Sequence, residues 1–228
     1  MEKRVRVIMC TACALLFTLT SRNAIAVTVG VDPTQTWIGY MNVSELPSNG
    51  GAYDFGGSWG TADLDASFSG PTLKLTPNTS IDRDVPLDTY WWQDASGTSP
   101  GNKIMAASMY VQNDALAGGT VNFTGLVLGN TLVSPYTSVA FIDDFVSDYS
   151  SFTTTTTPLV NGVFNISLAT SPGDHIQYGF VTTGPDARLA TIASLGEVDV
   201  TAVPEPSTVA MALTGLLGLV AFAKKRRV

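Results

Sequence analysis

Apolar and polar side chains alternate along most of the chain between residues 27 and 203. In the segment 103–111, every second side chain from Met105 to Val111 is apolar and its neighbours face the other way. A period of two residues is typical of β-strands, while no long stretch has the period of a helix. The alternation predicts strands at 27–31, 36–43, 72–75, 103–111, 121–128, 137–142, 164–168, 176–182 and 197–202.

Turn sequences rich in Gly, Pro and Asn separate these segments, for example at 48–51, 99–102 and 171–174. Many short strands divided by such turns favour an all-β domain, a two-sheet sandwich with a jelly-roll arrangement. A short helix is expected over 143–152, where three aromatic residues fall at helical spacing. The threonine run 153–157 fits either a loop or the edge of a sheet.

The N-terminus has the order of a secretory signal peptide. A basic head, a short apolar run and the small residues Ala24 and Ala26 follow one another, which predicts removal of 1–26 by cleavage after Ala26. An uncleaved membrane anchor is the alternative, but the apolar run is short for crossing a bilayer. Cys10 and Cys13 both lie in this segment, so the mature protein is expected to have no disulfide and no thiol nucleophile.

The C-terminal segment 203–228 has the order of a membrane stop signal. A Val-Pro-Glu-Pro motif at 203–206 precedes an uncharged run over 207–223, and four cations follow at 224–227. A run of this length is near the lower limit for a spanning helix, and the cations after it are expected to stay cytoplasmic. We therefore expect one transmembrane helix over 207–223; a buried core helix would rarely end in four cations.

This C-terminal segment resembles the PEP-CTERM sorting signal of Gram-negative bacteria. Pro204, Glu205 and Pro206, the apolar run and the basic end occur in that family's order. The resemblance implies recognition by exosortase, a membrane-embedded cysteine transpeptidase-like enzyme whose substrate this chain would be. It also implies a path from the inner membrane to the cell surface or extracellular matrix, and a link to exopolysaccharide and biofilm. It does not extend to the predicted extracytoplasmic domain, 27–202.

The predicted domain is strongly acidic. Between 27 and 203 there are four basic and 17 acidic residues, which gives a net charge of −13. A phosphate backbone needs clustered Lys and Arg, so nucleic acid is excluded as a partner.

Three groups of acidic residues are the candidates for a cation site. Oxygen-rich loops bind Ca²⁺, but none of the groups has the spacing of an EF-hand or a calcium-binding repeat. A solvated acidic surface is favoured over structural calcium, and we expect no other cofactor. A pair of these carboxyls acting as a glycosidase acid and base is a weaker alternative. The groups are Asp63 and Asp65; Asp82, Asp84 and Asp88; and Asp143, Asp144 and Asp148.

His175 is the only histidine in the chain. A metal site built from histidines needs more than one, and no nucleophile-elbow sequence points to a serine triad. We therefore expect an ordinary exposed or hydrogen-bonded side chain, and no catalytic residue is assigned.

Aromatic residues supply the candidate ligand-binding positions. Tyr90, Trp91 and Trp92 are consecutive, so they cannot all face one side of a strand and at least one should be exposed. Exposed Trp beside Asp and Gln suits stacking on sugar rings, which makes Trp91, Trp92 and Trp59 candidates for carbohydrate binding. Core packing is the alternative.

The sequence thus favours a non-enzymatic exported protein of the cell surface or matrix. A carbohydrate-binding module that uses the exposed aromatics is the second interpretation, and a secreted hydrolase is the third. The ligand and the oligomeric state do not follow from the sequence.

Overall fold

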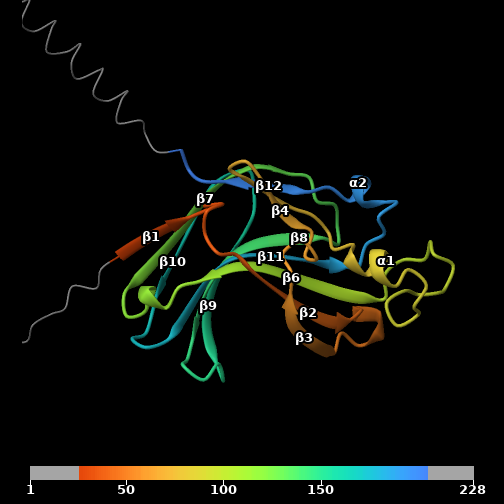
Figure 1. The fold of residues 1–228 in the computed structure, drawn as a ribbon, viewed down its shortest axis with the longest axis horizontal. Helices are drawn as coiled ribbons and strands as arrows, with labels where there is room; N and C mark the ends of the chain where they lie inside the picture. The colour runs from red at the N-terminus through yellow and green to blue at the C-terminus, as the bar shows by residue number, and fades with distance from the viewer. Residues whose placement is uncertain (1–25, 205–228) are drawn as a thin grey trace, which may run out of the picture.

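The computed structural model describes residues 26–204, which form two β-sheets packed face to face (Figure 1). The predicted transmembrane helix over 207–223 and most of the predicted signal peptide, including Ala24, lie outside the described residues. So do Glu205 and Pro206, whereas Ala26 and Pro204 are described. Within 26–204, no helix has both the length and the apolar character needed to cross a membrane.

Sheet B is entirely antiparallel. In spatial order it contains β3 (Tyr53–Trp59), β2 (Ile38–Glu45), β6 (Lys103–Gln112), β11 (His175–Pro185), β8 (Thr137–Phe145) and β9 (Phe152–Pro158).

Sheet A is built around β7 (Thr120–Asn130). One edge of β7 pairs with β10 (Gly162–Ala169). The other edge is shared end to end by β1 (Ala26–Gly30), which is parallel to β7, and by β12 (Val198–Thr201), which is antiparallel. Beyond β12 lie β5 (Thr72–Leu75) and β4 (Ala66–Ser69).

The last eight strands alternate between the sheets. β5, β12, β7 and β10 are neighbours in sheet A, and β6, β11, β8 and β9 are neighbours in sheet B. Every connection from β5 to β12 crosses from one sheet to the other, except the β8–β9 hairpin. Strands distant in sequence are therefore adjacent in space, and most of the pairing that holds the sheets is long-range.

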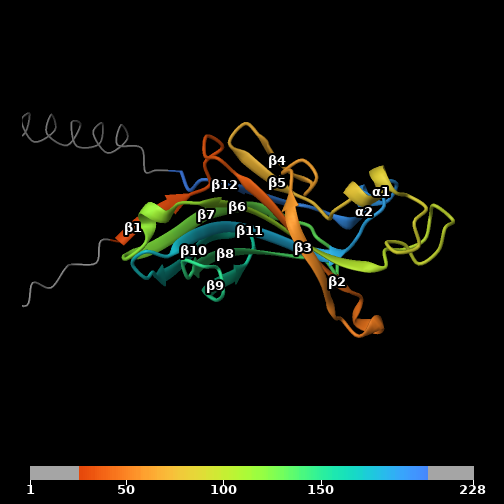
Figure 2. The same cartoon turned by 60° about the horizontal axis from the view of Figure 1, so that its bottom comes forward.

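Helices are few and short: α1 (Ser80–Asp84), α2 (Ile192–Leu195), and the 3-10 turns η1 (Pro47–Asn49) and η2 (Asp114–Leu116). The longest connection, 76–102 between β5 and β6, contains α1. It projects at one end of the domain, whereas the chain enters and leaves the described part at the opposite end (Figures 1 and 2).

The core lies between the sheets and is centred on Phe123 of β7, which is fully buried. Its ring centroid lies 5.2 Å from that of Tyr178 and 5.3 Å from those of Phe164 and Phe180. Each fully buried aromatic or aliphatic side chain contributes about 1.5–3 kcal/mol. Because residues 26–204 contain no cysteine, this burial is the main stabilising term of the described domain.

All nine predicted strands are present, with ends shifted by a few residues at most. Three further strands, β3, β4 and β9, were not predicted, although a sheet edge was one of the two interpretations of the threonine run now in β9. The tandem Gly56–Gly57 weakens the strand signal of β3, since glycine has low β-propensity.

The predicted helix over 143–152 is wrong. β8 runs on to Phe145, the chain turns, and β9 starts at Phe152, which is the direct cross-strand partner of Phe145. The ring centroids of these two residues are 4.7 Å apart, and that of Tyr149 lies 5.6 Å from Phe145. This hairpin brings together residues four and seven positions apart, as a helix would, so the spacing of the aromatics did not distinguish the two structures.

Candidate functional site: a groove on sheet B

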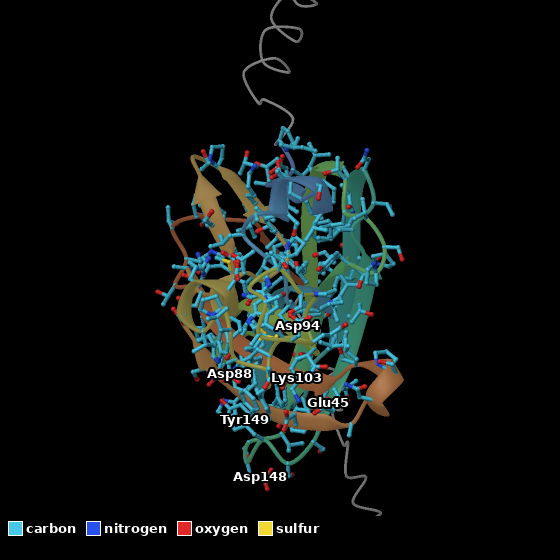
Figure 3. All side chains as sticks on the ribbon, turned by 90° about the vertical axis from the view of Figure 1, so that its right-hand side faces the viewer. Glu45, Asp88, Asp94, Lys103, Asp148 and Tyr149 are labelled. Carbon is cyan, nitrogen blue, oxygen red and sulfur yellow. The ribbon has the colours of Figure 1, made fainter. Side chains whose placement is uncertain are left out.

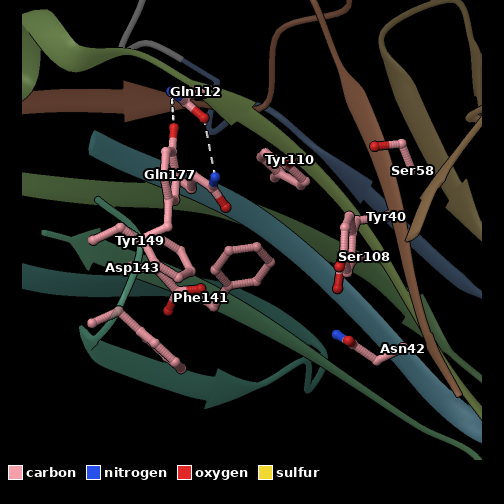
Figure 4. A pocket seen from close by; sticks show the side chains of 12 residues that line it. Tyr40, Asn42, Ser58, Ser108, Tyr110, Gln112, Phe141, Asp143, Tyr149 and Gln177 are labelled. Carbon is pink, nitrogen blue, oxygen red and sulfur yellow. Dashed lines mark hydrogen bonds between the residues drawn. The ribbon is translucent and has the colours of Figure 1, made fainter. Parts of the chain in front are cut away.

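The outer face of sheet B carries a groove with a volume of about 550 Å³ (Figure 4). Strands β2, β3, β6, β8 and β11 supply its floor and sides, and the β8–β9 hairpin supplies one rim. The lining side chains are aromatic or polar and mostly uncharged: Tyr40, Asn42, Ser58, Ser108, Tyr110, Gln112, Phe141, Asp143, Phe145, Tyr149, Phe152 and Gln177.

Gly179 of β11 lies between two residues that line the groove, and it adds no side chain there. It pairs with Tyr110 on one side and with Phe141 on the other, and both of these residues line the groove. A Cβ atom at this position would lie 2.6 Å from the Cα of Tyr110, closer than real Cβ atoms approach. The absence of a side chain at Gly179 therefore permits the close pairing of β11 with β6.

A polar network lies at one end of the groove. The side-chain amide of Gln177 donates to Oε1 of Gln112 at 3.1 Å, and the amide of Gln112 donates to the hydroxyl of Tyr149 at 2.9 Å (Figure 4). These bonds fix the orientation of two amides that face the groove. Each amide has both donor and acceptor atoms, which suits recognition of hydroxyl groups.

Tyr149 is held in place by unusual geometry. Its backbone has φ 58°, a left-handed conformation that non-glycine residues rarely adopt. Its ring stacks on the imidazole of His175, with centroids 4.5 Å apart and an interplanar angle of 6°. Strained backbone of this kind concentrates at functional positions, and here it places an aromatic side chain that is 49% exposed at the rim.

His175, expected to be exposed or hydrogen-bonded, lies behind this stack. Its Nδ1 lies 2.8 Å from Oδ2 of Asp114, and its Nε2 faces the carbonyl oxygen of Ser147 at 3.3 Å. The hydrogen bond with the Asp114 carboxylate raises the pKa of His175 above its ordinary value. His175 therefore orients Tyr149 through the ring stack and forms a pair with Asp114.

Asp143 is the one carboxyl group among the residues that line the groove. Burial raises its pKa to about 6, while the hydroxyl of Thr154 acts in the opposite direction. The groove therefore contains one carboxyl group, and burial disfavours its ionised form.

The prediction that Trp92 is an exposed sugar-binding residue is wrong, because its side chain is fully buried. The indole nitrogen donates to the carbonyl oxygen of Val85 at 3.0 Å, and the guanidinium of Arg188 covers the ring. Core packing was the alternative for these aromatics, and it holds for Trp92.

The other two candidate tryptophans are half-buried and lie outside the groove. Trp91 packs edge-on against Tyr90 and Phe55, with centroids 4.8 Å and 6.0 Å away. Trp59 lines a smaller pocket of about 390 Å³ together with Asp63 and Asp84. The structure thus does not bring the three tryptophans into one site, and carbohydrate binding by Trp91 or Trp59 stays a prediction.

A buried lysine organises the end of the domain near these aromatics. Lys103 forms an ion pair with Glu45, which is labelled beside it in Figure 3. It also pairs with Asp54 and lies 4.1 Å over the ring of Tyr90. The Tyr90 hydroxyl donates to Asp54, and burial with this hydrogen bond raises the pKa of Tyr90 to about 12. These contacts tie the 76–102 connection to β2 and β3.

The acidic groups are largely engaged by protein partners. Asp65 accepts hydrogen bonds from Thr79 and pairs with Arg83, and Asp82 pairs with Arg188. Among residues 26–204, no group of three or more His, Cys, Asp or Glu side chains is placed to hold a metal ion. Structural calcium stays a prediction.

Sequence reasoning missed most of the groove. Asp143, Phe145, Tyr149 and Phe152 were noted, but as an acidic group and a helix. The available signal was the face of 103–111 opposite the apolar one, which carries Ser108 and Tyr110 rather than charges.

No curated protein and no solved structure matches the chain. The comparison with protein families matches residues 202–227 to the PEP-CTERM protein-sorting motif. This match begins directly after β12 and includes Pro204, Glu205 and Pro206, as the resemblance implied. The chain therefore carries a PEP-CTERM sorting motif behind a β-sandwich domain, which makes it an exosortase-targeted, membrane-anchored export substrate of the cell surface.

Proposed function

We propose that the protein is a non-enzymatic surface or matrix component whose β-sandwich binds polysaccharide in the groove on sheet B. The observation that carries this proposal is the combination of exposed aromatic rings with ordered amides on one concave face. Aromatic faces stack on the apolar faces of sugar rings, and amides exchange hydrogen bonds with sugar hydroxyls. Exosortase processing would deliver such a domain to exopolysaccharide and biofilm.

The chemistry of the groove favours binding over hydrolysis. Glycosidases of the common kinds place two carboxyl groups on either side of the scissile bond. Asp143 is the only carboxyl group among the twelve residues that line this groove, and His175 lies behind the rim in contact with Asp114. A groove with one carboxyl group lacks the acid and base pair of such enzymes, and this supports a role in binding.

We also infer that strands β5–β12 form a jelly roll. The strand orders β5-β12-β7-β10 and β6-β11-β8-β9 support this arrangement, because each sheet interleaves early strands with late ones. β1 to β4 are additions: β2 and β3 widen sheet B and supply Tyr40, Asn42 and Ser58 to the groove.

The test is binding of the purified full-length protein to a panel of soluble polysaccharides by affinity electrophoresis. Tyr149→Ala removes the exposed ring at the rim and should weaken binding about 5- to 10-fold, the equivalent of one stacking contact. Tyr53→Ala is the matched control, because Tyr53 is 64% exposed on the same sheet but does not line the groove. It should leave binding unchanged.

Trp91→Ala separates the groove from the site first expected at the tryptophans. Binding that is lost in Trp91→Ala but kept in Tyr149→Ala would place the ligand at the other end of the domain and refute the groove. The absence of binding to every polysaccharide in the panel would refute the proposed function itself.

A further inference from the structure

The groove offers no positive charge to a ligand. Its lining residues include three tyrosines, three amides, two serines and three phenylalanines, but no Lys, Arg or His. Hydroxyl and amide groups serve as both donors and acceptors, so they match an uncharged ligand that is rich in hydroxyls. A carboxylate or sulfate on the ligand would lack the cation that normally compensates it.

No cation elsewhere in the described domain is free to take this role. All four Lys and Arg side chains of 26–204 form ion pairs within the domain. The pairs are Lys74 with Glu197, Arg83 with Asp65, Lys103 with Glu45 and Asp54, and Arg188 with Asp82.

The electrostatic field of the whole domain also disfavours an anionic ligand. With four basic and 17 acidic residues between 27 and 203, the domain has a net charge of −13. Glu45, Asp88 and Asp94 are spread over the end that carries the 76–102 connection (Figure 3). An anionic polymer approaching such a surface is repelled, and the repulsion is strongest at low ionic strength.

We propose that the groove selects uncharged, hydroxyl-rich polysaccharides and rejects acidic ones, with Asp143 as the residue that enforces the rejection. This inference rests on the proposed function and narrows its ligand to one chemical class. Asp143 pairs with Gln177 across β8 and β11, so its carboxylate lies beside an amide that faces the ligand. It accepts hydrogen bonds from sugar hydroxyls and repels a ligand carboxylate.

The charge of Asp143 at neutral pH fits this role, since its pKa of about 6 leaves the carboxyl ionised there. Two further charged side chains, His175 and Asp114, pair with each other behind Tyr149. They present no net charge to the groove when His175 is protonated.

The experiment compares neutral glycans, laminarin and hydroxyethyl cellulose, with acidic ones, alginate and polygalacturonate. Binding of the full-length protein is measured by affinity electrophoresis and calorimetry at low and high salt. At least one neutral glycan should bind with an affinity that salt does not change, and Tyr149→Ala should weaken it. The acidic glycans should not bind at low salt.

Two substitutions test the role of charge directly. Gln177→Lys adds a cation to the groove and should create binding to acidic glycans that high salt abolishes. Asp143→Asn keeps the shape of the side chain and should reduce the discrimination against acidic glycans by about 5-fold or more, roughly 1 kcal/mol. Asp94→Asn, an acid outside the groove, is the control and should not change selectivity.

The outcomes separate the two proposals. Acidic glycans that bind the parent protein in the groove, with loss in Tyr149→Ala, would refute the selectivity and leave the groove as a polysaccharide site. Unchanged discrimination in Asp143→Asn would refute the role of that residue. Binding to no glycan of either class would refute the proposed function.

Discussion

The guanidinium of Arg188 lies over the indole ring of Trp92, with 3.4 Å between Cζ and the ring centroid. Both side chains are buried, and Arg188 also donates to Oδ1 of Asp82 at 2.6 Å and to the carbonyl oxygens of Ser99 and Pro86. One side chain therefore joins the segment after β11 to three parts of the 76–102 connection. Such stacking is stronger in the interior, where water does not compete for the cation.

Removal of this contact should destabilise the domain strongly. Trp92→Ala deletes a fully buried side chain and should lower the free energy of unfolding by about 3–5 kcal/mol. Arg188→Ala leaves the largely covered carboxylate of Asp82 without its ion-pair partner, at a similar cost. Urea denaturation measures both. Arg83→Ala, which breaks a more exposed ion pair with Asp65, should cost at most about 1 kcal/mol. Equal effects of Arg188→Ala and Arg83→Ala would contradict this account.

Asp186 should make the domain more stable in mild acid than at neutral pH. Burial raises its pKa to about 7, and its Oδ2 has no hydrogen-bond partner. The folded state keeps a proton that the unfolded state loses near pH 3.8, so stability falls as pH rises from about 4 to about 7. Asp186→Asn should remove this slope and stabilise the protein at pH 8, by at most about 4 kcal/mol.

The control for this prediction is Asp148→Asn. Asp148 is exposed and its pKa is lowered by hydrogen bonds with Ser150, so its replacement should give no gain at pH 8. Denaturation of the parent and both variants across this pH range provides the measurement. A slope that persists in Asp186→Asn would show that other groups cause it.

The single histidine should titrate above its ordinary pKa because of Asp114. A group whose folded pKa is raised contributes stability below its unfolded pKa, and loses that contribution as pH rises through the folded value. Asp114→Asn should move the NMR titration midpoint of His175 to lower pH. Asp174→Asn, which removes a more distant acid, should move it less. An unchanged midpoint in Asp114→Asn would mean that the pair does not form in solution.

Signal cleavage after Ala26 should precede docking of the first strand. The predicted scissile bond joins Ala26 to Val27, and both residues pair with β7 in the folded domain. A peptidase needs an extended, unpaired chain, so it must act before β1 adds to the sheet. N-terminal sequencing of exported protein should give Val27, and folded precursor should resist the peptidase. An exported protein that begins at Met1 would contradict the signal-peptide interpretation.

Replacement of Pro204, Glu205 and Pro206 by Ala should abolish processing but not export. The signal peptide and the apolar run are unchanged, so full-length protein should accumulate in the inner membrane of an exosortase-containing host. Substitution of the basic residues 224–227 should instead weaken the stop and orientation signal. Molecular mass and membrane fractionation distinguish the two. A triple variant that is shortened and released like the parent would refute sorting through the motif.

The sequence alone was enough to identify the C-terminal sorting motif and the class of the fold. The sorting motif depends on contiguous residues, and so does strand alternation, because successive side chains of a strand point to opposite faces. Both features are therefore determined by residues that are neighbours in the sequence. The placement of nine of the twelve strands followed from it.

Only the tertiary structure decided which side chains are available to a ligand. Trp92 is buried in the core with Arg188, almost a hundred residues later, packed over its ring. Tyr149 is exposed at the rim, where the β8–β9 hairpin and the stack with His175 hold it. The groove joins residues from all six strands of sheet B, which come from distant parts of the chain. Exposure depends on such long-range pairing, which the alternation of apolar and polar residues within each strand does not determine.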